Sequence, residues 1–108
     1  MRISEKKAVE DPVLRACAKR WPALQHYKMN GMGKRSWPDQ MFMIPGGKPF
    51  FIEFKSPGEE PTPLQWVQIR RMQADGYEVS VFDDKDEALA AIERRVTAAL
   101  RHDRRKAT

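Results

Sequence analysis

The sequence is poor in cysteine and has no long apolar run. Cys17 is the only cysteine among 108 residues, which excludes an internal disulfide and a zinc site built from several cysteines. We interpret it as a small apolar helix residue, because no partner base for a nucleophile is evident. No apolar run approaches the ~20 residues of a membrane span, and the N-terminus lacks the apolar region of a signal peptide. We therefore expect a soluble, cytoplasmic protein without membrane contacts.

A phosphate-binding loop for nucleotides is also missing. The segment from Gly31 to Arg35 is rich in glycine and basic residues, but it lacks P-loop spacing. We interpret it as a DNA-facing loop in which Lys34 and Arg35 contact the nucleic acid. A nucleotide cofactor is not expected.

The overall composition is that of one folded, basic domain. Apolar residues make up 41% of the chain, too many for a disordered protein, and the net charge is +5. Residues 1–35 hold nine Lys and Arg against three acids, whereas residues 36–100 hold seven against eleven. An acidic region beside a basic one favours a site for a polyanion that also holds cations. We expect a single domain over residues 1–100 and a short basic tail over 101–108.

Residues 36–57 predict a β-hairpin, with strand 49–55 alternating Phe50, Ile52 and Phe54 with Phe51, Glu53 and Lys55. Because side chains alternate across a strand, Glu53 and Lys55 share a face. A three-residue turn, Pro45-Gly46-Gly47, with a glycine at positive φ, pairs residues whose numbers sum to 92. Asp39 then lies opposite Glu53, whereas a one-residue shift would put the two acids on opposite faces.

Two facing carboxylates with a nearby lysine predict metal-assisted phosphodiester hydrolysis. Opposed residues have Cβ atoms roughly 4.5–5.5 Å apart, so Asp39 and Glu53 could share one ion. Oxygen ligands suit Mg²⁺ or Mn²⁺, and Lys55 could stabilise phosphate charge or orient a water molecule. The alternative is a surface salt bridge, since Glu-x-Lys pairs are common on strands.

Helical patterns flank the hairpin. Residues 3–20 predict a helix capped by Ser4, and Pro12 implies either a regular start near Asp11 or a kink. A strand over 23–30 carries Lys28 and an isolated His26. Thr62 and Pro63 begin a helix that runs to about Ala74 and stops at Gly76, and residues 77–82 predict a fourth strand.

The last helix has Asp83, Asp84 and Asp86 at its start, and we interpret these acids as capping residues in preference to metal ligands. The apolar stripes expected to be buried are Leu64, Val67, Ile69 and Met72 in the second helix, and Ala88, Leu89, Ile92, Val96 and Leu100 in the last.

These elements predict an α/β fold of order αβββαβ plus a C-terminal helix. A mixed four-stranded sheet would be flanked by helices, because the crossover from the third strand through a helix makes the fourth strand parallel to it.

The order of elements and the residues Pro38-Asp39 and Glu53-Phe54-Lys55 resemble the PD-(D/E)xK nuclease superfamily, with its restriction-endonuclease-like core. Over residues 9–92 the chain resembles the virus-type replication and repair nuclease domain, VRR-NUC. The further matching features are Glu10, Lys28, the glycine loop, the Pro-Gly-Gly turn, the Ser56-Pro57-Gly58 strand exit, Leu64-Gln65 and Gly76. Trp37 and Pro12 depart from the usual pattern.

The resemblance implies an endonuclease that uses Mg²⁺ or Mn²⁺ to cut DNA. It implies Asp39 and Glu53 as metal ligands, Glu10 as a third ligand or water-holding acid, Lys55 as the catalytic lysine and Gln65 as an accessory residue. From sequence alone, Glu10 could equally be a cap and Gln65 a solvated residue. The resemblance also implies a phage or prophage protein of a bacterial host that forms a homodimer and cuts branched DNA, such as four-way (Holliday) junctions.

Two other functions stay open from sequence. The first is a DNA-binding module that keeps the fold without catalysis. The second is a structural protein of a virus particle, which only charge and size support.

Overall fold

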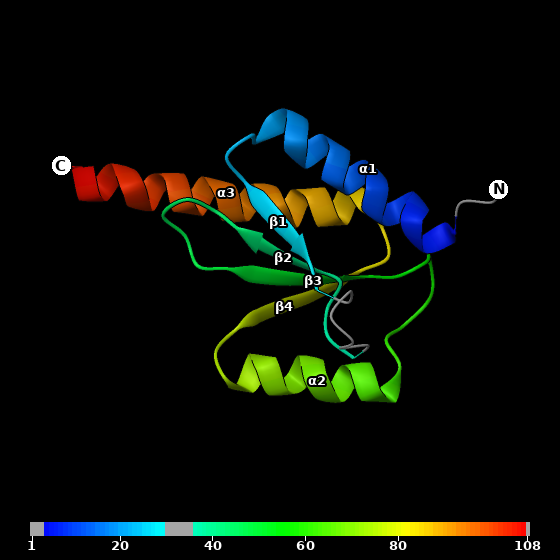
Figure 1. Cartoon of the computed structure of the whole chain (residues 1–108). Helices are drawn as coiled ribbons and strands as arrows, with labels where there is room; N and C mark the ends of the chain where they lie inside the picture. The colour runs from blue at the N-terminus through cyan, green and yellow to red at the C-terminus, as the bar shows by residue number, and fades with distance from the viewer. Residues whose placement is uncertain (1–3, 30–35, 108) are drawn as a thin grey trace.

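Three helices and four strands form three layers in the computed structural model, which describes residues 4–29 and 36–107, with side chains up to Arg101. Figure 1 shows α1 and α3 on one face of the sheet and α2 on the other. The elements are α1 (Glu5–Arg20), β1 (Gln25–Lys28), β2 (Gln40–Met43), β3 (Phe50–Phe54), α2 (Pro63–Ala74), β4 (Glu78–Phe82) and α3 (Lys85–Ala107). None of the described helices is both long and apolar enough to cross a bilayer.

The predicted α/β fold with its mixed sheet is confirmed. The strand order is β1-β2-β3-β4, with β1–β2 and β2–β3 antiparallel and β3–β4 parallel. All five residues of β3 are buried, because the strand has neighbours on both sides and helices on both faces.

The hairpin register is also confirmed. Gln40 pairs with Ile52, Met41 with Phe51, and Phe42 with Phe50. The turn is closed by Gly47 N–H donating to the Ile44 carbonyl at 2.9 Å, with Gly46 at a φ of 78°. That positive φ is open to glycine at little cost, so the turn sequence fixes the register.

The core divides at the sheet. On the α1 and α3 side, Phe42 stacks on Phe50 with ring centroids 5.1 Å apart, and Ile52 and Phe54 extend the same cluster. On the α2 side, Phe51 and Val79 pack with Ile69 and Met72. The period of two along β3 therefore assigns Phe50, Ile52 and Phe54 to one layer and Phe51 and Glu53 to the other.

Helix α1 is continuous from Glu5 to Arg20, with Ser4 as its N-cap and Pro12 inside it. A regular start near Asp11 is therefore wrong, and Glu10 lies in the second turn. A proline inside a helix removes one backbone hydrogen bond. In α1 the packing of Val9, Val13 and Cys17 in the core offsets this loss. The other predicted boundaries agree within a few residues, but residues 101–107 continue α3 and do not form a separate tail.

Two predicted apolar stripes are partly wrong. Leu64 and Val67 are 66% and 64% exposed, and α2 buries Ile69 and Met72. In α3, Leu100 is 56% exposed and Ala99 is buried in its place. Ala99 lies close to the face of Ala88, Ile92 and Val96, whereas Leu100 is turned about 100° further round the helix.

Candidate metal and catalytic site

Asp39 lies at the start of β2, held by contacts to three segments. Continuing the β2–β3 register by one residue places it opposite Glu53, on the face of Met41 and Phe51. Its Oδ2 accepts a hydrogen bond from Phe54 N–H at 2.8 Å, its Oδ1 accepts one from Lys6 Nζ at 2.7 Å, and its carbonyl accepts one from Met29 N–H. Asp39 is only 2% exposed, so this carboxylate is held in one orientation.

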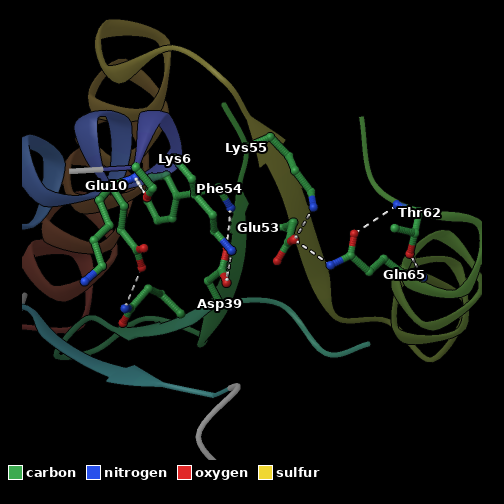
Figure 2. Close-up of polar contacts among 11 residues, drawn as sticks. Lys6, Glu10, Asp39, Glu53, Phe54, Lys55, Thr62 and Gln65 are labelled. Carbon is green, nitrogen blue, oxygen red and sulfur yellow. Dashed lines mark hydrogen bonds and ion pairs between the residues drawn. The ribbon is translucent and has the colours of Figure 1, made fainter. Parts of the chain in front are cut away.

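Glu53 is 1% exposed, and its two oxygens have different surroundings. Figure 2 shows its Oε2 between Lys55 Nζ at 3.3 Å and Gln65 Nε2 at 3.0 Å. Among the described residues, Oε1 is buried and has no hydrogen-bond partner. Leaving a buried carboxylate oxygen unpaired is costly. The side chain therefore presents one oxygen to a cation or a proton.

Burial, the negative charge of Asp39 and a hydrogen bond to Asp39 together raise the pKa of Glu53 to about 7. The ammonium groups of Lys6 and Lys55 oppose this shift. When both acids are ionised, no proton is shared between them. When Glu53 is protonated, it can share that proton with Asp39. This is the behaviour of two carboxylates placed together without a cation.

Lys55 and Gln65 approach Glu53 from different elements. Lys55 follows β3 directly and is 8% exposed. Gln65 is in the first turn of α2, where its Oε1 accepts a hydrogen bond from Thr62 N–H and Thr62 Oγ1 accepts one from Gln65 N–H. This capping box begins the helix, and the Nε2 of the same side chain reaches Glu53. Gln65 thus links the start of α2 to the site.

Glu10 lies apart from the two facing acids. Its Oε2 accepts a hydrogen bond from Gln40 Nε2 at 2.9 Å, and Gln40 also contacts His26 Nδ1 at 3.3 Å. Gln40 precedes Met41 and follows Asp39, so it points to the opposite face of the sheet. Within the described ranges, no three or more His, Cys, Asp or Glu side chains are grouped so as to hold a metal ion.

The remaining predicted residues lie outside this cluster. Lys28 is exposed at the end of β1, while Lys34 and Arg35 lie outside the described residues. Asp84 Oδ2 accepts from Glu87 N–H and caps α3, and Asp83 Oδ2 accepts from Gly58 N–H and fixes the strand exit. The interpretation of these two acids as structural residues agrees with their contacts.

Sequence reasoning missed Lys6 and Gln40. Lys6 comes from α1, and its contact to Asp39 joins residues 33 positions apart. One signal was available: Lys6 precedes Glu10 by four residues, so the two share a helix face. No local signal marks Gln40, because its partner Glu10 is 30 positions away in the chain.

The donor set fits a hard divalent cation. Two carboxylates on one face, one with a buried oxygen that no described residue pairs, suit Mg²⁺ or Mn²⁺, which take few protein ligands and keep several waters. A lone Glu-x-Lys surface pair would not be buried this deeply.

Comparison with known proteins supports the same fold. A solved structure described as a VRR_NUC domain protein superposes with a TM-score of 0.68 over 90% of this chain and 92% of that chain, at 18% sequence identity. The chain has the VRR-NUC fold. The resemblance stated from the sequence is thereby confirmed at the level of the fold.

A sequence relative is named "Putative nuclease p44", from Acyrthosiphon pisum secondary endosymbiont phage 1. It is 43% identical over 60 residues, which are 56% of this chain and 64% of the relative, so the match spans under two thirds of its length. No protein-family model matches the chain.

Without metal, the protein is expected to lose stability as the pH rises from about 5 to about 8. An unfolded glutamate titrates near 4.5, whereas Glu53 in the fold titrates near 7. The folded state therefore holds more protons between these values, and the stability contributed by protonated Glu53 is lost as the pH rises through about 7. The loss should be on the order of 2–3 kcal/mol.

Urea unfolding in EDTA at several pH values measures this loss. Glu53→Gln keeps the shape of the side chain and removes its titration, so its stability should change much less across the same range. An equally steep pH dependence in Glu53→Gln would assign the effect to another group.

Proposed function

We propose that the chain is a divalent-metal-dependent DNA endonuclease of the VRR-NUC type, hydrolysing phosphodiester bonds. The observation that carries the proposal is the pair of buried carboxylates, Asp39 and Glu53, on one face. Lys55 lies beside Glu53, whose Oε1 is unpaired among the residues that the structure describes. The relative named as a nuclease and the basic net charge add support.

Asp39 and Glu53 would hold Mg²⁺ or Mn²⁺. When bound, such an ion lowers the pKa of a coordinated water and neutralises charge on the phosphate. The protein's own part is to hold the two carboxylates in position. Phe54 N–H fixes Asp39, while Lys55 and Gln65 fix Glu53 through its Oε2.

In this proposal Lys55 has a second role, toward the reacting phosphate. Its ammonium group can donate to an attacking water or to the phosphate oxygen that gains charge. Gln65 orients Glu53 from the first turn of α2. Glu10, bonded to Gln40, fits a water-holding acid better than a direct ligand, because it lies with the opposite face of the sheet.

The DNA contacts and assembly in this proposal come mainly from the sequence resemblance. Lys28, exposed on the edge strand, and the loop residues Lys34 and Arg35 would bind the sugar-phosphate backbone. A homodimer could place one cut on each of two strands of branched DNA such as a four-way junction. The phage origin of the relative supports a phage or prophage protein acting in a bacterial cytoplasm.

The test is cleavage of supercoiled, linear and four-way-junction DNA with Mg²⁺, Mn²⁺ or EDTA, alongside calorimetric metal titration and sedimentation analysis. We expect metal uptake, a dimer, and cleavage with either metal that EDTA stops, strongest on the junction. Asp39→Asn protein, purified in the same way, is expected to be inactive. Equal cleavage by Asp39→Asn would identify a contaminating nuclease.

Other outcomes discriminate the functions. DNA binding without metal uptake or cleavage would favour the catalytically silent module. Cleavage of all three DNAs at the same rate would contradict the proposed preference for branched DNA and would still support the nuclease activity. Cleavage of the junction by a monomeric protein would contradict the proposed homodimer.

A further inference from the structure

Both oxygens of Asp39 already have donors in the folded chain. Phe54 N–H bonds Oδ2, and Lys6 Nζ bonds Oδ1 at 2.7 Å. The contact from Lys6 is an ion pair, with the Asp39 side chain only 3% exposed. A cation that needs Asp39 Oδ1 therefore meets an ammonium group already in that position, whereas Glu53 Oε1 has no hydrogen-bond partner in the described part of the chain.

The metal-free fold requires positive charge at this point. Asp39 and Glu53 are buried on one face, where two negative charges would repel each other. Lys55 and Gln65 both contact Glu53, and Lys6 supplies positive charge directly at Asp39.

The side chain of Lys6 can also move out of the site into solvent. Its side chain is 33% exposed, compared with 10% for that of Lys55. It is a long, flexible side chain on the first turns of α1, and in Figure 2 it approaches Asp39 from the α1 side, away from Gln65. Lys6 can thus leave Asp39 for solvent without a change in the backbone.

We propose that Lys6 is a built-in counter-cation of Asp39, which stabilises the metal-free fold and which a divalent ion must displace in order to bind. This inference rests on the proposed function, because it requires that Asp39 and Glu53 bind metal. The form in which Lys6 contacts Asp39 does not bind the metal. The apparent affinity for the metal is therefore the intrinsic affinity multiplied by the fraction of molecules in which this contact is open.

The test compares Lys6→Met and Lys7→Met with wild type. Methionine keeps the length of the lysine stem and removes its charge, and Lys7 is the exposed neighbour on the same helix. Calorimetry with Mn²⁺ should show that Lys6→Met binds about five- to tenfold more tightly than wild type, since release of a charge-assisted hydrogen bond no longer opposes binding. Lys7→Met should bind like wild type.

Thermal unfolding supplies a readout that does not depend on catalysis. In EDTA, Lys6→Met should unfold at a lower temperature than wild type, because the buried carboxylate of Asp39 loses the ammonium group of Lys6. Saturating Mn²⁺ should narrow or reverse that difference, since a ligand stabilises in proportion to its affinity. The same affinity for Mn²⁺ in Lys6→Met and wild type would overturn the inference.

The proposed function and this inference fail differently. If wild-type protein takes up no Mn²⁺ or Mg²⁺, the proposed metal site is lost and the inference with it. If wild type binds metal and the affinity is unchanged by Lys6→Met, only the inference is overturned.

If Lys6→Met does not fold without metal, nitrogen-detected NMR of lysine side chains in wild type answers the question. Mg²⁺ should shift the Lys6 ammonium signal and leave that of Lys7 in place. An unchanged Lys6 signal at saturation would contradict displacement.

Discussion

Lys55→Met protein is expected to cleave DNA about 10²–10³-fold more slowly than wild type while still taking up Mg²⁺ or Mn²⁺. Lys55 is 8% exposed and lies 3.3 Å from Glu53 Oε2, so its ammonium is fixed beside the carboxylates without being a metal ligand. Methionine fills the same space but cannot donate to water or phosphate. The measurements are single-turnover cleavage rates and calorimetric metal affinity on the same preparation.

Lys48→Met is the matched control for this variant. Lys48 is an exposed lysine of the same hairpin, at the far end from the acids. Its replacement changes net charge equally and should alter cleavage little. A comparable loss in both variants would mean that overall charge, and not the position of Lys55, governs the rate. Loss of metal uptake in Lys55→Met would mean that the lysine maintains the carboxylate site.

Phe42→Ala is expected to destabilise the protein by about 3–5 kcal/mol. Phe42 is fully buried and stacks on Phe50 across the β2–β3 pair, with an interplanar angle of 9°. Alanine would leave a cavity between the sheet and the helices above it, and would remove an aromatic cross-strand contact that supports the register. The shift of the urea unfolding midpoint at constant slope measures the loss.

Tyr27→Ala provides the comparison on the neighbouring strand. Tyr27 is 50% exposed and bonds Gln25 on the surface, so its loss should cost under about 1 kcal/mol. A loss below about 1 kcal/mol for Phe42→Ala as well would show that the core closes around the missing ring, contrary to the close packing seen here.

The fold could be predicted from sequence because its main signals are local. The alternation of Phe50 to Lys55 defined a strand, and Pro45-Gly46-Gly47 determined the register that places Asp39 and Glu53 on one face. Thr62 and Pro63 fixed the start of α2. Each of these signals lies within a few residues of the feature that it determines.

The parts that sequence could not supply depend on how elements pack. Lys6 reaches Asp39 only because the first turn of α1, on one face of the sheet, lies next to the start of β2. In α2, the orientation that points Gln65 toward Glu53 turns Leu64 and Val67 away from the sheet. Periodicity finds an apolar stripe but does not choose its rotation when a polar residue must face inward.

Gln65 couples the start of α2 to the carboxylate of Glu53. The side chain that closes the capping box also holds Glu53, so fraying of this helical turn removes the support of the carboxylate in the same event. In the proposed nuclease, the local order of this turn and the competence of the site would therefore be one equilibrium. A copy whose second helix has begun to unwind would lose activity together with that turn.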